Sequence, residues 1–197
     1  MAKTTLGFRV KSGWAAAVVL SDPLSSPSVL HARRIELSDP EVPESRQPFH
    51  AVDDTLGDSE RDQNQIEKRL RLVRAATERS IAKLWADSVN DGRTPVRAGI
   101  VTGSLVDPAT IRQPHIRAHA MEGRLFRTVV EDALRAYDVS CVVLAEKSAF
   151  ERASGVIHLG EGELKRTLAD LGRRVEGPWK SEEKLAALAA WVALSSE

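Results

Sequence analysis

The order of short apolar segments and amphipathic helices is the feature that most constrains how this chain can fold. Two short apolar runs, residues 6–10 and 14–20, are separated by Lys11-Ser12-Gly13, a connection typical of a β-hairpin. After a turn rich in Pro and Ser, residues 29–37 alternate apolar and polar side chains. The chain is therefore expected to open with a three-stranded antiparallel meander.

Helical periodicity then alternates with buried strands. Residues 66–88 carry side chains at spacings of three and four, which predicts an amphipathic helix: Ile66, Leu70, Val73, Thr77, Ile81 and Leu84. Buried strands are expected at 97–102 and 140–146, with a helix at 116–137 between them. One or two short helices are expected within 148–174, and a last helix at 182–194 with Ser181 as its N-cap.

Strand–helix–strand connections of this length place the last two strands parallel. The prediction is a single α/β domain over residues 1–197, with a mixed five-stranded sheet and helices on both faces. Residues 39–65, which include Pro40, Pro43, Pro48 and Phe49, are expected to form a long loop. An exposed Phe49 in this loop would make it a contact segment for a protein partner.

Charge and cysteine content exclude several classes of protein. The chain has 28 basic and 28 acidic residues, which argues against a dedicated nucleic-acid coat protein or a polybasic membrane protein. The one cysteine, Cys141, lies in an apolar run and is expected to be a small buried side chain. We see no apolar leader, and the longest apolar run, near 185–194, is too short to span a bilayer. A cytoplasmic location without membrane contact is therefore expected.

The opening segment carries a family resemblance. Leu6-Gly7-Phe8-Arg9-Val10-Lys11-Ser12-Gly13-Trp14-Ala15 has the pattern strand, glycine-containing turn, strand. Together with the element order, it resembles the ribonuclease H-like superfamily, especially the Holliday-junction-resolvase branch, and also uncharacterised bacterial proteins. The resemblance implies acids on the first strand, near the end of the fourth strand and on the last helix, where they hold two divalent cations.

The chain departs from that pattern of acids. Arg9 stands on the first strand, and the fourth strand runs into Thr102-Gly103-Ser104, with no carboxylate before Asp107. Glu182 and Glu183 are the only matching acids, so they are the metal candidates, and a divalent metal is disfavoured. The leading hypothesis is a pseudo-nuclease that binds a phosphate-bearing ligand, foremost nucleic acid, without two-metal cleavage.

Basic residues supply a candidate phosphate site. Arg9 and Lys11 alternate onto one face of the first strand and, with Ser12, Ser104 and a helix N-terminus, could frame an anion. The alternative is that Arg9 pairs with Glu122 or Glu146 inside the protein. A further basic residue, Arg33 on the third strand, is either an ion-pair partner or a contact to a nucleic-acid backbone.

A second candidate site lies at the start of the helix at 116–137. His115, His119 and Glu122 are spaced i, i+4 and i+7, so they share one stripe on the core-facing side. Three interpretations compete: structural hydrogen bonds, acid–base catalysis with His119 oriented by Glu122, and a zinc site. The helical HExxH order is absent, and the sequence shows no other Cys or His cluster for the remaining zinc ligand. The sequence leaves open whether the protein is an enzyme.

Overall fold

The sheet of the computed structural model has five strands in the order β3-β2-β1-β4-β5. The structure describes residues 3–22, 25, 27–50 and 60–196. Neighbouring strands are antiparallel in β1–β2 and β2–β3 and parallel in β1–β4 and β4–β5, which confirms the predicted meander and parallel pair. The strands are β1 (Thr4–Lys11), β2 (Trp14–Ser21), β3 (Ser28–Glu36), β4 (Pro95–Thr102) and β5 (Ser140–Ala145).

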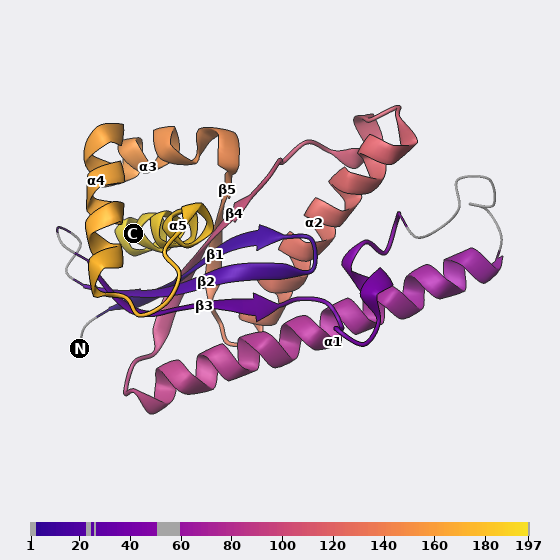
Figure 1. The fold of residues 1–197 in the computed structure, drawn as a ribbon, viewed down its shortest axis with the longest axis horizontal. Coiled ribbons are helices and arrows are strands. Elements are labelled where there is room, and N and C mark those ends of the chain that lie inside the picture. The colour runs from indigo at the N-terminus through magenta and orange to yellow at the C-terminus, as the bar shows by residue number, and fades with distance from the viewer. Residues whose placement is uncertain (1–2, 23–24, 26, 51–59, 197) are drawn as a thin grey trace.

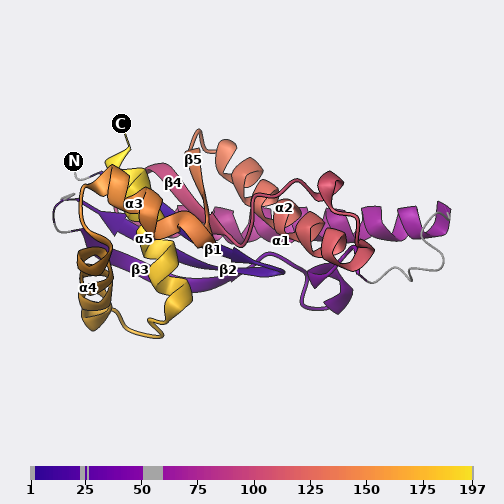
Figure 2. The same ribbon diagram turned by 90° about the horizontal axis from the view of Figure 1, so that it is seen from above.

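Helices cover both faces of this sheet (Figures 1 and 2). The first two pack on one face, and the last packs on the other with two shorter helices beside it. They are α1 (Glu60–Asn90), α2 (Pro114–Arg135), α3 (Ala149–Ile157), α4 (Glu161–Leu171) and α5 (Ser181–Ser195). Short 3-10 turns occur at Pro43–Arg46, Pro108–Thr110, Glu146–Ser148 and Gly172–Arg174. No helix in the described ranges is long and apolar enough to cross a bilayer.

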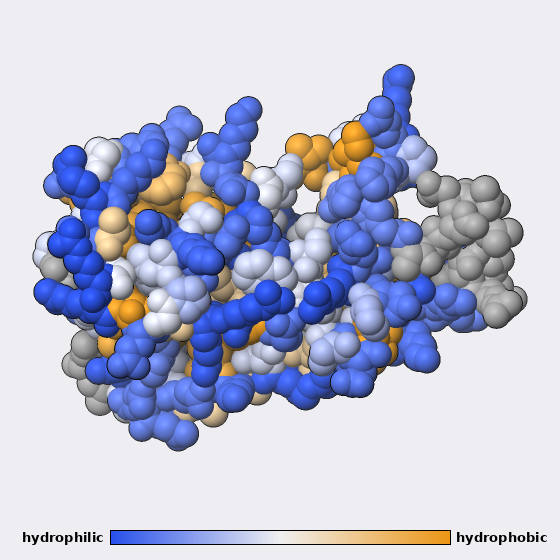
Figure 3. Space-filling view, viewed as in Figure 1, coloured by the Kyte–Doolittle hydropathy of each residue, from blue (hydrophilic) through white to orange (hydrophobic). Residues whose placement is uncertain are grey.

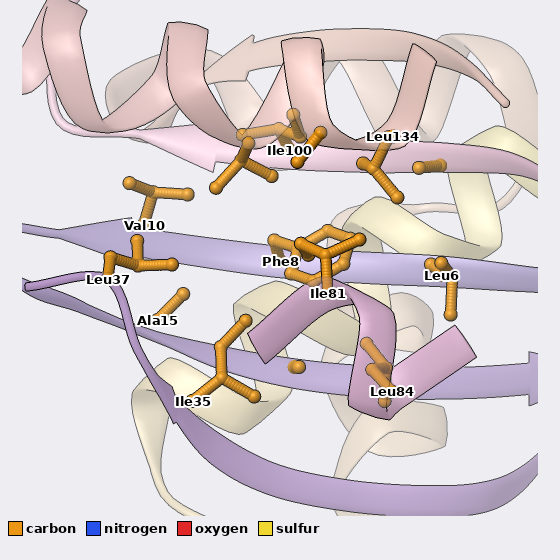
Figure 4. Close-up of a cluster of buried hydrophobic side chains, with 14 of the residues drawn as sticks. Leu6, Phe8, Val10, Ala15, Ile35, Leu37, Ile81, Leu84, Ile100 and Leu134 are labelled. Carbon is orange, nitrogen blue, oxygen red and sulfur yellow. The ribbon is translucent and has the colours of Figure 1, made fainter. Parts of the chain in front are cut away.

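The core between the sheet and helices α1 and α2 follows from the side-chain alternation of β1. Leu6, Phe8 and Val10 point to this face and meet the apolar stripe of α1, including Ile81 and Leu84 (Figure 4). Thr77, the weakest member of that stripe, is also buried, with its hydroxyl 3.5 Å from the carbonyl oxygen of Leu37.

The opposite face of β1 and β4 lies directly against the backbone of α5. A Cβ atom at Gly7 would overlap the carbonyl oxygen of Ala186, and a Cβ atom at Gly99 would overlap that of Ala189. The small side chains of the segment SEEKLAALAAWVALS permit this approach. It also brings the first turn of α5, with Glu182, beside the end of β1.

Most boundaries lie within one or two residues of the sequence-based expectation, and two of the differences bear on local structure. Helix α1 begins at Glu60, six residues before the predicted start at residue 66. The pattern missed these residues, ERDQNQ, because all of them are polar and give no apolar periodicity. The loop expected at 39–65 is therefore shorter; its residues 51–59 lie outside the described part. Ser181 is the first residue of α5 instead of its N-cap, since the cap is Lys180, whose backbone N–H donates to Glu183 Oε2 at 2.8 Å.

Candidate functional site

The carboxyl ends of β1, β4 and β5 meet at one edge of the sheet, because these strands are parallel. The turn between β1 and β2 and the N-termini of α2 and α5 lie at the same edge. In open α/β sheets, this is the edge at which ligands usually bind. We call it the carboxyl edge.

Arg9 is the central charged residue of the carboxyl edge. Its side chain is 2% exposed and forms a short hydrogen-bonded ion pair with Glu146, which follows β5. Its Nε lies 3.1 Å from Oε2 of Glu182, which is close enough for an ion pair but not aligned for a hydrogen bond. Its Nη1 donates a hydrogen bond of 2.9 Å to the backbone carbonyl oxygen of Val10. Lys11 Nζ lies 3.4 Å from the other oxygen of Glu182. Two cations and two carboxylates therefore balance one another.

This geometry favours the pairing alternative for Arg9 over a direct phosphate contact. A guanidinium removed from water needs a nearby countercharge, and Glu146 and Glu182 provide it on two sides. Glu122, the other partner considered, is not involved. Both metal candidates on α5 are also engaged, Glu182 with the cations and Glu183 with the helix cap.

The remaining phosphate candidates lie apart. Ser12 is exposed in the β1–β2 turn, and Ser104 is exposed after β4 with its Oγ accepting from Val106 N at 3.1 Å. Arg33 is not at this edge: it lies in mid-strand on the α1 side of the sheet, 2.6 Å from Asp87 of α1. The Arg33 guanidinium holds the pKa of the Asp87 carboxyl below its usual value.

Other basic and apolar side chains surround the carboxyl edge. Arg112, Arg117 and Lys147 are exposed and have no ion-pair partner among the described residues. Around Arg112 and Arg117, the loop between β4 and α2 and the start of α2 expose large aliphatic groups, and Figure 3 shows apolar atoms gathered there. These are Leu105, Val106, Ile116 and Met121.

The structure joins the two histidines of α2 to a third that the spacing did not predict, His50. One nitrogen each from His50, His115 and His119 lies within 4.8 Å of the others. The His119 Nε2 and His115 Nε2 atoms are 3.2 Å apart, and the His50 ring centroid is 4.0 Å from that of His119. His50 Nδ1 lies 2.8 Å from Oε1 of Glu122, so the loop histidine and the helix carboxylate are joined by a direct hydrogen bond. We call these four residues the histidine cluster.

Glu122 is the buried anion of the histidine cluster. Its side chain is 0% exposed, and its Oε2, like His50 Nε2, has no hydrogen-bond partner in the described ranges. Leaving such an atom unpaired costs about 1–3 kcal/mol. Burial lowers the pKa of His119, and the nearby His50 and His115 lower it further, while Glu122 opposes the shift. The lowered pKa favours the neutral imidazole of His119, the form that can bind a cation.

Sequence reasoning missed His50 because no periodicity connects a loop residue to a helix 65 positions later. Its only signal was an aromatic neighbour, Phe49, in a polar proline-containing stretch. Phe49 itself, expected to be exposed, is partly buried. The role of residues 39–65 in binding a protein partner stays a prediction, since 51–59 lie outside the described residues.

Comparison with known proteins identifies the fold. No protein-family model and no curated protein matches this chain. Two solved structures of Thermus thermophilus RuvC do match, one of them in complex with a Holliday junction substrate, with TM-scores of 0.57 for the complex and 0.56 for the other. Each is 11% identical, covering 98% of this chain and 93% of the RuvC chain. The chain thus has the ribonuclease H-like fold, which confirms the fold prediction.

Proposed function

We propose that this protein binds nucleic acid at the carboxyl edge without cutting it by two-metal chemistry. The observation on which the proposal rests is the pairing of Arg9 with Glu146 and Glu182. In a two-metal site, carboxylates converge so that their negative charge attracts cations. Here a buried guanidinium lies between the carboxylates and neutralises them, so a divalent ion would meet a positive charge instead of a cage of oxygens.

Exposed groups around the carboxyl edge suit a phosphate backbone and unstacked bases. Arg112, Arg117 and Lys147 are free to neutralise phosphates, which is the main source of nucleic-acid affinity. The aliphatic side chains of Leu105 and Ile116 lie in the same region, and aliphatic groups inserted between bases are a common way to hold distorted DNA. A nucleic-acid ligand also fits the expected cytoplasmic location.

The proposal can be tested by fluorescence anisotropy with a four-way DNA junction and a linear duplex over a range of salt concentrations. We expect binding that weakens with salt, with a log–log slope of about −0.9 for each phosphate contact. The triple variant Arg112→Ala, Arg117→Ala, Lys147→Ala should bind more weakly and with a shallower slope. A matched triple variant, Arg93→Ala, Arg166→Ala, Arg174→Ala, removes the same charge near α4 and the amino end of β4. In Figure 1 these elements lie away from the start of α2, so this variant should bind like the wild type.

Cleavage is measured on the same junction with Mg²⁺ or Mn²⁺, and with T. thermophilus RuvC as positive control. We expect no product. Absence of binding at low salt would overturn the proposed ligand. Metal-dependent cleavage that is lost in Glu182→Gln would overturn the proposed lack of two-metal chemistry.

A second candidate, acid–base catalysis on an anionic substrate, is favoured by the 2.8 Å contact between His50 and Glu122. In this reading His119 moves the proton and Glu122 orients the imidazoles. A panel of nucleotides and phosphoesters, compared between the wild type and His119→Ala, tests it. Equal turnover by the two proteins on every accepted substrate would exclude His119 from catalysis.

A further inference from the structure

We propose that His50, His115 and His119 form a binding site for one zinc-like transition-metal ion, with Glu122 as the supporting carboxylate behind them. The site does not depend on nucleic-acid binding, because its ligands belong to the histidine cluster and not to the Arg9 network. Imidazole nitrogens are ligands for Zn²⁺, Cu²⁺, Ni²⁺ and Fe²⁺ but not preferred ligands for Mg²⁺.

The spacing of the rings suits a small tetrahedral ion. Zinc–nitrogen bonds of about 2.0–2.1 Å in tetrahedral geometry place neighbouring nitrogens roughly 3.3 Å apart. The Nε2 atoms of His119 and His115 are 3.2 Å apart. One nitrogen from each of the three rings lies within 4.8 Å of the others. To coordinate one ion, the nitrogens at the larger separation would have to move closer together.

Glu122 orients the rings in the way that a metal site needs. A zinc-bound histidine usually donates its other ring N–H to a carboxylate, which fixes the tautomer and leaves the second nitrogen for the metal. His50 Nδ1 is bonded to Glu122 Oε1, so its Nε2 is the free nitrogen, and that atom has no hydrogen-bond partner in the described structure. His119 Nδ1 lies 3.9 Å from the second Glu122 oxygen, with its Nε2 turned toward His115.

Burial and exposure indicate the type of site. The carboxylate of Glu122 is fully buried, His50 is 16% exposed, and His119 is 50% exposed. Three protein ligands with one side open to solvent match the sites in which zinc keeps a position for water or a substrate oxygen. The ligand class for that open position is an anionic oxygen, such as hydroxide or phosphate.

The test uses full-length protein with any histidine tag removed, stripped with a chelator and titrated with Zn²⁺ against a chromophoric competitor. Co²⁺ serves as a second probe, because its visible absorption reports tetrahedral nitrogen coordination. We expect one ion per chain and a higher melting temperature with Zn²⁺, since a ligand that binds only the folded state stabilises it. Glu122→Gln should weaken zinc binding by about 10- to 100-fold, the usual effect of losing a supporting carboxylate.

Matched variants separate a metal site from a structural cluster. His115→Ala removes one proposed ligand with the least effect on the fold, because this ring is exposed and its removal leaves the His50–Glu122 hydrogen bond in place. This variant should bind zinc more weakly than the wild type. His158→Ala, at an exposed histidine after α3, is the control and should bind like the wild type. Sub-stoichiometric zinc in the wild type, or equal affinity in His115→Ala and His158→Ala, would overturn the proposal.

Discussion

At the scale of single residues, Arg9 determines which charges the carboxyl edge can accept. Its position on the central strand is the one at which the resolvase-like pattern has an acid, and the sequence was enough to predict that difference. The sequence predicts Glu146 as one of two alternative partners of Arg9, with Glu122 as the other. It does not predict Glu182 as a partner, because that residue matches a metal-binding acid of the family. Spacing along the chain cannot show which carboxylates a buried guanidinium will reach, because that depends on how β1, β5 and α5 pack together.

The variant Arg9→Asp tests whether the guanidinium replaces a cation. It would place a third carboxylate beside Glu146 and Glu182, so we expect a less stable protein in the absence of metal. Mn²⁺ should restore about 2 to 3 kcal/mol of the free energy of unfolding when present at roughly 100 times its dissociation constant. Urea denaturation with and without Mn²⁺ measures this. Arg9→Met, which removes the charge without adding an acid, leaves two carboxylates instead of three and should gain less from Mn²⁺. An equal gain in both variants would refute the argument.

Cys141 gives a second prediction at this scale. Burial, with the nearby carboxylate of Glu131, raises the pKa of its thiol from 9.0 to about 11. Because only the thiolate reacts, alkylation of the folded protein below pH 9 should be roughly 100-fold slower than that of the urea-unfolded chain. Mass spectrometry of iodoacetamide-treated samples at pH 8 measures the two rates. Equal rates would show that the thiol is not shielded in the fold.

At the scale of elements, regular periodicity was a reliable guide and isolated residues were not. The strands and the apolar stripe of α1 were predicted because each buried face repeats every two, or every three to four, residues. The polar first turns of α1 and the cap at Lys180 were not, since neither produces a repeating signal. The histidine cluster shows the same limit: its two helical members share a face by spacing, whereas His50 arrives from a loop.

The packing of α5 on the sheet gives a prediction for Gly99. Gly99→Ala would push a methyl group into the backbone of Ala189, so we expect a loss of stability at the upper end of the usual range for overpacking, about 3 kcal/mol. Gly103→Ala is the matched control, because a Cβ at Gly103 meets no atom within 4 Å. Urea denaturation of both variants decides the point. Similar stabilities would mean that α5 can move away from β4 at little cost.

At the scale of the whole molecule, one sheet separates two cores. The neighbours of the central strand β1, which are β2 and β4, contribute side chains to both cores, so the same backbone hydrogen bonds between strands hold both cores in place. The prediction of one domain over 1–197 therefore has a direct consequence: both cores should unfold together.

Tryptophan fluorescence can report each core separately. Trp85 packs against the α1 side and Trp191 lies in the core on the α5 side. Trp14 and Trp179 also pack on the α5 side, so the variant Trp85→Phe keeps tryptophans of that side alone, and the triple variant Trp14→Phe, Trp179→Phe, Trp191→Phe keeps Trp85 alone. In each variant, the urea midpoint from fluorescence should equal that from far-UV circular dichroism. Separate midpoints for the two cores would show that they are independent units.

The self-contained charge balance at the carboxyl edge also bears on how the protein responds to its surroundings. Because Arg9 and Lys11 are part of the polypeptide, the positive charge beside Glu182 is present from the moment the chain folds. The shape of this edge should then be independent of the cell's magnesium supply and unaffected by its depletion. Among the described residues, the proposed metal ligands are the imidazoles of the histidine cluster, so the molecule would respond to a zinc-like transition metal and not to magnesium.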